Sequence, residues 1–454
     1  MDNKTSSEKL ADYVYDITYD VLDKRVKEKV SLLFLDWLGS ALSGANTNEA
    51  SILMRALNEQ KGFGNSALIG YGKQDNATMA AFINGFTSHI VEYDDTHRDS
   101  LYHPGAPTIS AALAIAQQIR ASGKSFINGL VAGYEVGIRL AASVNPSHYS
   151  YWHTTGTIGC FGAAASVASI AELSKEQCVH AFGHAGSMSA GLWEFQNDHA
   201  KSKPIHPGRA AQGGIFAVLL AKEGLVGAKS IIDGKQGIFA AMTKEHSLKP
   251  IFNRIPNTYV IEETTIKVYP TCGHTHTPID AALDVHTKIS KNINMINRIT
   301  VKTNSIALKV AGNQNPTTAN EAKFSIPFCV AVSLAYGELN TKSFHDSMIF
   351  DPVVRQLMNR VDVISTEEFN KVFEICRPTR IEVLMSNDEL ITSEIKYRRG
   401  DPENPVGKDF IKNKFLELNI SNYPLGFLEE IFEFCRSLDQ INDMRELNNI
   451  LAAK

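Results

Sequence analysis

Apolar residues recur every three or four positions through most of the first half of the chain. This spacing is the period of an amphipathic α-helix, because it places apolar side chains on one face. It is clearest in residues 26–42 and 77–91, within a longer region from 7 to 118. Gly, Ala and Ser are concentrated in three further stretches, 129–142, 156–171 and 210–221. Small side chains let helices approach closely without voids, so these stretches predict buried helices.

β-branched residues start to alternate with other residues after about residue 257. Residues 264–270 (TTIKVYP) and 298–303 (RITVKT) carry this pattern on either side of a helical stretch over 278–289. Alternation of this kind is typical of strands. The passage therefore predicts a strand, a helix and a second strand.

A second β pattern lies close to residue 390. Residues 380–384 and 390–397 flank a polar triplet (SND) that suits the turn of a hairpin. Between the two β passages, residues 325–337 and 351–361 have helical spacing. This part of the chain predicts a mixed α/β unit.

Helical spacing returns near the end of the chain, in residues 409–418 and 425–438. We expect these helices to pack on the first ones, so that both chain ends build one domain. The predicted fold is mostly α, with a large all-helical domain (1–260 and 400–454) and an inserted smaller α/β domain (261–399). A chain of 454 residues is long enough for more than one core.

Composition and charge exclude several classes of protein. A formal net charge of -4 and a pI near 6.4 give no basic field for nucleic acid. The polar start (MDNKTSSEKLADY) is unlike a secretory signal, and no segment approaches the ~20 apolar residues of a membrane span. The six cysteines form no CxxC pair, which argues against a disulfide framework or a zinc knuckle. We expect a soluble, cytoplasmic protein.

The first of four polar passages is residues 92–107, which lies between two predicted helices. It brings together Asp94, Asp95, Thr96, His97 and His103. A carboxylate can orient a neighbouring imidazole, and hydroxyl and imidazole groups bind acids, so the passage is a candidate for proton transfer. The alternative is helix capping by the aspartates and a simple turn at His-Pro-Gly.

The second and third passages each lead into a helix rich in small residues. In residues 148–159, His153 precedes a helix start near Gly156, where free backbone N–H groups favour an anion. In residues 201–211, Lys203 and Arg209 offer the cations that a di- or trianionic substrate requires. Lys203 is also a candidate base if burial lowers its pKa. The alternatives are a capping histidine and solvated surface lysines.

The fourth passage, residues 267–280, contains Cys272, His274 and His276. These three are possible zinc ligands, but no carboxylate or CxxC pair stands at a suitable distance to complete a site. An acid/base or substrate-binding role for His276 and ordinary turn chemistry are the other interpretations. The chain has no GxGxxG after a strand, no GxxxxGK[ST] and no GxSxG, which disfavours nucleotide chemistry and serine hydrolysis.

Four motifs in order, EYDDTHRDSLYHPGAP, KSKPIHPGRAAQGG, KVYPTCGHTHTPID and EAKFSIPFCVAVSLAYG, resemble those of the MmgE/PrpD family over about residues 8–430. That family includes 2-methylcitrate dehydratase, cis-aconitate decarboxylase and iminodisuccinate epimerase. The resemblance implies a helical domain from both chain ends, an inserted α/β lid, a homodimer, and an active site at the domain interface without metal or organic cofactor. The implied functional positions are Asp94, Thr96 or its neighbour, His103, His153, Lys203 and His276.

Two departures from the family pattern bear on the reaction. Family dehydratases typically continue the His-Pro pair with Ser-Asp-Asn, whereas this chain continues Gly105-Ala106-Pro107. Family members also often carry a tyrosine near Ser-x-Pro, where this chain has Phe328. The first departure weakens the dehydratase assignment, and the second removes a candidate phenolic proton donor.

The sequence predicts a cofactor-free lyase that moves a proton at a carbon beside a carboxylate in a small di- or tricarboxylic acid. The catalytic candidates are His103, Lys203, His276 and Asp94. The substrate-binding candidates are Thr96, His153, Arg209 and His274. Epimerisation of a dicarboxylate such as iminodisuccinate, a metal-dependent hydrolase and a non-catalytic binding protein stay open as alternatives.

Overall fold

The computed structural model describes residues 4–60, 62–198, 200–289, 292–373 and 375–452. The chain divides into two compact units, residues 1–266 with 407–454 (unit 1) and residues 267–406 (unit 2). The mostly helical fold class is confirmed, with strands confined to two small sheets in the described part of the chain.

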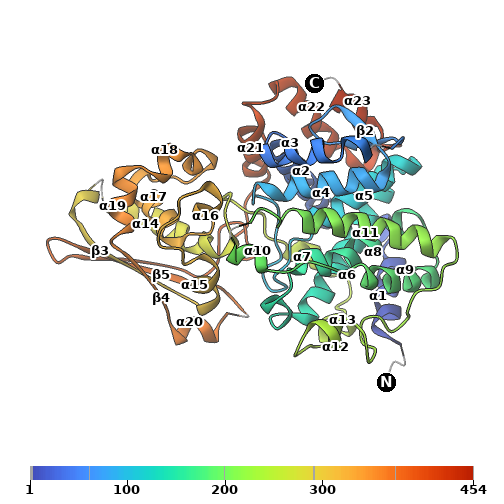
Figure 1. Ribbon diagram of the computed structural model, residues 1–454, viewed down its shortest axis with the longest axis horizontal. Coiled ribbons are helices and arrows are strands. Elements are labelled where there is room, and N and C mark those ends of the chain that lie inside the picture. The colour runs from blue at the N-terminus through green and yellow to red at the C-terminus, as the bar shows by residue number, and fades with distance from the viewer. Residues whose placement is uncertain (1–3, 61, 199, 290–291, 374, 453–454) are drawn as a thin grey trace. The chain divides into compact units, whose positions relative to one another are not determined.

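Unit 1 is built from helices contributed by both chain ends (Figure 1). Its helices are α1 (Ser6–Asp16), α2 (Lys24–Gly44), α3 (Asn48–Ala56), α4 (Ala77–Ile90), α5 (Gly105–Ile119), α6 (Gly123–Val144), α7 (Thr154–Thr157), α8 (Gly159–Ile170), α9 (Lys175–Ser187), α10 (Glu194–Asn197), α11 (Ile205–Lys222), α12 (Ile238–Met242), α13 (Lys249–Phe252), α21 (Lys408–Asn419), α22 (Leu425–Arg436) and α23 (Glu446–Ala452). The unit also contains an antiparallel pair of three-residue strands, β1 (Ser66–Leu68) and β2 (Lys73–Asp75). The hydrophobic pattern did not predict them, because three residues are too few to show alternation.

Small residues bring α4 and α11 close together. A Cβ on Gly85 of α4 would lie 2.8 Å from the Cα of Gly208 in α11. A Cβ on Gly208 would lie 2.4 Å from the carbonyl oxygen of Phe82. Only glycine therefore fits at this crossing. The close approach places the end of α4 beside the start of α11, where several polar side chains meet.

The C-terminal helices pack on the first long helix, as Figure 1 shows for α21 beside α2. The side-chain amide of Asn419 donates to the carbonyl of Gly39 at 3.2 Å. Lys414 forms a buried ion pair with Asp36, with 2.6 Å between Nζ and Oδ1. The amphipathic spacing in the last part of the chain correctly predicted helices that close unit 1.

Unit 2 is a four-stranded sheet with helices packed against it. Its elements are α14 (His276–Lys288), β3 (Ile296–Thr303), α15 (Ser305–Ala311), α16 (Ala319–Lys323), α17 (Ile326–Tyr336), α18 (Asp346–Ile349), α19 (Pro352–Met358), β4 (Val361–Ser365), α20 (Glu367–Lys371), β5 (Thr379–Met385) and β6 (Leu390–Ile395). The strand order is β4-β3-β5-β6, with β3 and β4 parallel and the other pairs antiparallel. The predicted hairpin is confirmed as β5 and β6, and RITVKT lies within β3.

The predicted strand over residues 264–270 is wrong. The segment makes only one isolated bridge among the described residues, between Thr265 and Thr96. Ile266 and Val268 are buried, so the β-branched side chains serve packing rather than a sheet. The predicted helix over 351–361 also ends early, at Met358, and β4 starts at Val361.

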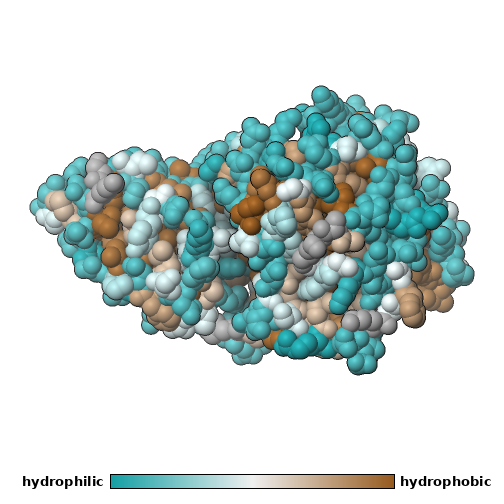
Figure 2. Space-filling view, turned by 90° about the horizontal axis from the view of Figure 1, so that it is seen from above, coloured by the Kyte–Doolittle hydropathy of each residue, from teal (hydrophilic) through white to brown (hydrophobic). Residues whose placement is uncertain are grey.

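Hydrophilic residues cover much of the face shown in Figure 2, and apolar residues gather in patches between them. In the described part of the chain, no helix combines the length and apolar character needed to cross a membrane.

Candidate active site

The loop that joins α4 to α5 is held in a strained shape. Glu92 and Leu101 have positive φ angles of 59° and 51°. Residues other than glycine rarely adopt this region, and such strain often accompanies functional sites. Lys414 of α21 donates to the carbonyl oxygen of Tyr93 at 2.8 Å, so the C-terminal part of the chain fixes this loop.

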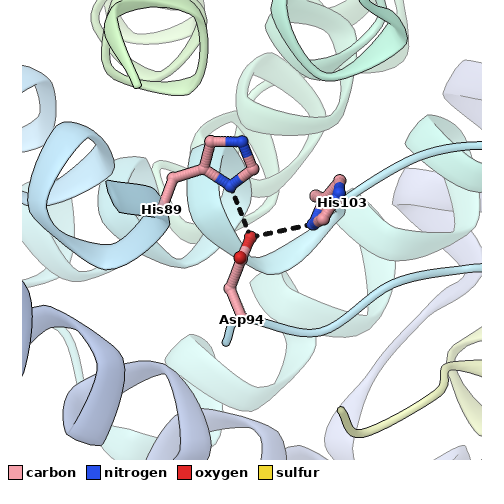
Figure 3. A group of neighbouring side chains, drawn as sticks. All are labelled: His89, Asp94 and His103. Atoms are coloured by element: carbon pink, nitrogen blue, oxygen red, sulfur yellow. Dashed lines mark hydrogen bonds and ion pairs between the residues drawn. The ribbon is translucent and has the colours of Figure 1, made fainter. Parts of the chain in front are cut away.

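Two histidines share one carboxylate oxygen at this loop (Figure 3). Nδ1 of His89, in the last turn of α4, lies 2.7 Å from Oδ2 of Asp94. Nδ1 of His103 lies 3.0 Å from the same oxygen. His89 and Asp94 are almost fully buried, whereas 15% of the His103 side chain is exposed. We call His89, Asp94 and His103 the His-Asp-His group.

The ionised state of Asp94 fixes the tautomer of the His89 and His103 rings. Burial opposes its ionisation, but the neighbouring His89 and His103 outweigh that effect and hold the pKa of Asp94 well below its usual value. A carboxylate can only accept hydrogen bonds, so each Nδ1 carries a proton and donates it. In a neutral His103 ring, Nε2 is then the unprotonated nitrogen, the one that can accept a proton.

The same three residues are the group that could hold a metal ion in the described part of the chain. One potential ligand atom from each lies within 4.8 Å of the others. However, both Nδ1 atoms already donate to Asp94, and a metal would have to replace those hydrogen bonds. Cys272, His274 and His276 do not form such a group among the described residues.

The neighbouring Asp95 holds the loop in place through hydrogen bonds. Its Oδ2 accepts from the Tyr134 hydroxyl at 2.7 Å, and its Oδ1 accepts from the backbone N–H of Gly105 at 3.0 Å. Burial raises the pKa of Asp95 to about 7. A Cβ at position 105 would lie 2.5 Å from Oδ1 of Asp95, so this contact requires glycine. The two adjacent aspartates thus have opposite environments.

Lys203 lies just before α11 and is buried. Its ammonium group forms an ion pair with Glu92, with 2.5 Å between Nζ and Oε1. Less than a tenth of either side chain is exposed. The alternative that Lys203 is a solvated surface lysine is therefore wrong. The ion pair connects the chain just before α11 to the strained loop.

His153 stands at the N-cap of α7 beside the His-Asp-His group. Its ring centre lies 5.8 Å from that of His89 and 6.4 Å from that of His103. Its Nδ1 lies 3.0 Å from Nδ1 of His206, in the first turn of α11. Burial, reinforced by the field of His206 and Lys203, holds the pKa of His153 well below its usual value, and burial lowers the pKa of His206 to about 4. Both rings are therefore neutral at pH 7.

The other candidates in unit 1 lie in two different environments. Thr96 is buried and pairs through its backbone with Thr265, and its hydroxyl has no hydrogen-bond partner among the described residues. Arg209 lies on the exposed side of α11 and donates to Gln212 at 3.3 Å. Helix α11 starts at Ile205 rather than near Ala210, so Arg209 lies inside the helix, where no hydrogen bond or ion pair joins it to the His-Asp-His group among the described residues.

The candidates of unit 2 lie at the start of α14. His274 and His276 are buried, and both ring nitrogens of His276 have no hydrogen-bond partner among the described residues. Burial, then the charge of Arg377 for His274 and of Arg398 and Lys267 for His276, holds the pKa of both histidines well below its usual value. These are neutral imidazoles in a region rich in buried cations.

Sequence analysis missed four residues of this chemistry. His89 lies inside a helical pattern, but its position five residues before Asp94 was a usable signal. His206 and Lys267 stood in the selected passages without a role, and Tyr134 lies in a helix with no local polar motif. Their importance depends on tertiary contacts that sequence spacing does not encode.

Two family models and several named proteins match this chain. Residues 8–251 match the model of the MmgE/PrpD N-terminal domain, and residues 269–425 match that of the C-terminal domain. The chain is 25% identical to the cis-aconitate decarboxylase-like protein oryM of Aspergillus oryzae, covering 97% of this chain and 94% of that protein. It is 24% identical to the cis-aconitate decarboxylase of Homo sapiens, covering 99% and 95%. It is 22% identical to the mitochondrial 2-methylcitrate dehydratase of Yarrowia lipolytica, covering 93% and 85%. The chain therefore belongs to the MmgE/PrpD family of lyases.

Proposed function

We propose that this enzyme breaks a bond in a small di- or tricarboxylic acid by moving a proton at a carbon next to a carboxylate. The observation that carries the proposal is the His-Asp-His group, in which Asp94 accepts from Nδ1 of His103 and so makes Nε2 the basic nitrogen of the neutral ring. Such reactions need a positioned acid or base and cations that hold the carboxylates.

We assign roles to the candidate residues on the same grounds. His103 moves the proton, and Asp94 orients the His103 ring. Lys203 and His153 bind substrate carboxylates. His276 is a second acid/base or carboxylate-binding group. Thr96, Arg209 and His274 are proposed substrate contacts, of which exposed Arg209 has the weakest structural support.

Among lyase reactions we favour decarboxylation of a cis-aconitate-like acid. In that reaction a C–C bond breaks, CO₂ leaves, and the electron pair that remains on the carbon chain takes up a proton. Relatives named cis-aconitate decarboxylase match at 23–25% identity over at least 96% of this chain. The tight contact of Gly105 with Asp95 also supports this branch, because the serine of the dehydratase pattern would not fit there.

The decisive experiment is proton NMR in D₂O with citrate, 2-methylcitrate, cis-aconitate, malate and iminodisuccinate. It distinguishes loss of CO₂, loss of water and deuterium exchange without net bond cleavage. We expect CO₂ loss from cis-aconitate, with deuterium incorporated into the product, and no product with His103→Ala or Lys203→Ala. Full turnover by His103→Ala would overturn the assignment of the proton-transfer group.

A matched control is His148→Gln in unit 1. His148 is a buried histidine whose ring contacts the Met242 carbonyl at 3.1 Å and the Thr157 hydroxyl at 2.7 Å. Its two ring nitrogens are engaged by the protein, so its variant should retain turnover. Stoichiometric metal in the purified protein, with activity lost on chelation, would instead support metal-dependent chemistry at the His-Asp-His group.

We also propose a homodimer and a cytoplasmic location. The exposed apolar residues Ile205, Phe216, Leu219 and Leu220 of α11 form a candidate interface. Light scattering of wild type and Leu219→Glu tests it, since a dimer that uses this face should dissociate. The six buried free cysteines fit a reducing compartment.

A further inference from the structure

A cavity lies in unit 1, between α2, α21, α22 and the neighbouring 3-10 turns η1 (Tyr19–Val21) and η8 (Leu438–Gln440). Its volume is about 540 Å³, within the ~300–1,000 Å³ range of small-molecule sites. None of the candidate catalytic residues lines it. The cavity is therefore separate from the proposed active site.

One face of α2 forms a wall of this cavity. The lining positions follow helical spacing, with cations at Lys24 and Lys27 and apolar groups at Leu32 and Leu35. Ile127 of α6 and Phe432 of α22 add to the apolar surface. Leu35 and Ile127 are almost fully buried, so the apolar floor is part of the packed core of unit 1.

The rim of the cavity is positively charged. It carries Lys24, Lys27, Lys408 and Arg436, against the carboxylates Glu28 and Asp439. Asp439 already accepts from the Tyr19 hydroxyl at 2.8 Å, and Glu28 pairs with Lys24 at 3.8 Å.

The remaining cations are placed to meet an anion. Lys27 lies over the Tyr19 ring, 3.9 Å from its centre, which holds the ammonium group at the cavity edge. Arg436 already pairs with Glu433, with 2.5 Å between Nη2 and Oε2. Lys408 is exposed and has no ion-pair partner among the described residues. Lys27 and Lys408 thus offer positive charge that no carboxylate of the described residues neutralises, next to an apolar floor.

We propose that this cavity is a binding site for a small amphipathic organic anion, with a carboxylate at the rim and an apolar body on Leu32, Leu35 and Phe432. An apolar body gains from burial on the floor, and a carboxylate gains from the Lys27 and Lys408 charges. A purely polar anion would leave the apolar floor exposed to water. A neutral apolar molecule would form no ion pair with the rim cations. The occupant therefore needs both parts.

Occupancy would connect helices that also brace the active-site loop. α2 carries Asp36 and α21 carries Lys414, and this pair fixes Tyr93 through its carbonyl. A ligand that contacts α2, α21 and α22 together stabilises the folded state, because it binds only the assembled site.

Isothermal titration calorimetry of the full chain with 4-phenylbutyrate tests the proposal. The matched probes are 4-phenylbutanol, which lacks the charge, and butyrate, which lacks the ring. We expect saturable one-to-one binding of 4-phenylbutyrate and at least tenfold weaker binding of each matched probe. Absence of saturable binding, or equal binding of 4-phenylbutanol, would overturn the proposal.

Charge reversal locates the site. The double variant Lys27→Glu/Lys408→Glu changes one half-buried and one exposed side chain and breaks no ion pair among the described residues, so it should fold. We expect at least a tenfold loss of 4-phenylbutyrate affinity, whereas Lys222→Glu, an exposed charge reversal on α11, should bind like wild type. Ser31→Trp should also block binding by filling the cavity. Unchanged affinity in the double variant would place any binding elsewhere and reject this site.

Discussion

The loop after α4 and the first turns of unit 2 both contain two histidines, but their environments differ. In the loop, His103 donates to the ionised Asp94, which also accepts from His89. At the start of α14, His276 has no hydrogen-bond partner among the described residues, and burial, then the charges of Arg398 and Lys267, disfavour its protonation by lowering its pKa.

This difference separates two kinds of chemistry. A carboxylate beside an imidazole fixes its tautomer and stabilises the imidazolium that forms when it takes a proton. Cations beside a buried neutral imidazole do the reverse, and they attract an anionic group to which the imidazole can donate. We therefore propose that the first region transfers the proton and the second binds substrate carboxylate. Each of the following variants tests one side of that division.

The largest effect is expected for Asp94→Asn. The variant keeps the size of the side chain but removes the charge that orients His103 and stabilises its protonated form. We expect kcat to fall by ~10³-fold, in the range typical of lost acid/base catalysis. The pH dependence of stability should also change. The pKa of Asp94 is lowered on folding, so its stabilisation is present above the unfolded pKa of about 3.9 and is lost as pH falls below that value.

Circular dichroism and steady-state kinetics of Asp94→Asn measure these two effects separately. A well-folded variant with kcat within tenfold of wild type would show that the His-Asp-His group only braces the loop. That result would remove the distinction between the two histidine regions.

Asp95→Asn should affect stability instead of catalysis. Burial raises the pKa of Asp95 to about 7, so the folded protein keeps a proton that the unfolded chain releases near pH 4. The free energy of unfolding of wild type therefore falls as pH rises from about 4 to about 7, and asparagine removes this loss. We expect the variant to gain ~1–3 kcal/mol relative to wild type between pH 5 and pH 8.

Urea denaturation at several pH values measures the Asp95→Asn effect, and kcat should stay within a few-fold of wild type. A stability difference that does not change with pH would show that Asp95 is ionised in the folded protein. The tyrosine and glycine contacts of Asp95 would then hold a charge rather than a proton.

Replacement of His276 should affect mainly substrate binding. We expect His276→Gln to raise KM by ~10- to 50-fold with a smaller change in kcat, consistent with loss of a hydrogen bond to a charged group. The control is His286→Gln in the same helix, because Nδ1 of His286 already contacts the Leu334 carbonyl at 2.7 Å. A loss of kcat at unchanged KM would instead assign His276 to proton transfer.

The sequence predicted the fold that positions these two histidine regions only in part. Helical spacing identified α2, α4, α21 and α22, and alternation identified the β5–β6 hairpin, because these signals are local. Alternation failed at 264–270, where Ile266 and Val268 are buried without a sheet. β-branched residues fit any buried extended segment, and the pattern alone does not reveal a partner strand.

The candidate site shows the same limit. The motif around Asp94 and His103 was visible because both residues lie in one loop. His89, His206 and Tyr134 were missed because helix packing, including the Gly85 and Gly208 crossing, brings them to the loop. The sequence also did not predict the opposite environments of Asp94 and Asp95, because adjacency in the chain does not determine burial or hydrogen-bond partners.

The smallest effect is expected for Thr96→Val, and it tests whether the loop also binds substrate. The Thr96 hydroxyl is buried without a partner among the described residues, and such a group costs stability unless a ligand uses it. Valine has the same shape, so we expect unfolding free energy to stay equal or rise by up to ~1 kcal/mol, while KM rises ~3- to 10-fold. Thr264→Val is the matched control, because its hydroxyl is equally buried and unpartnered and it has no proposed role. A gain in stability in both variants with KM raised only for Thr96→Val would assign a binding role to the loop in addition to proton transfer. Unchanged KM in both would leave substrate binding to the other proposed contacts, and the loop would serve proton transfer alone.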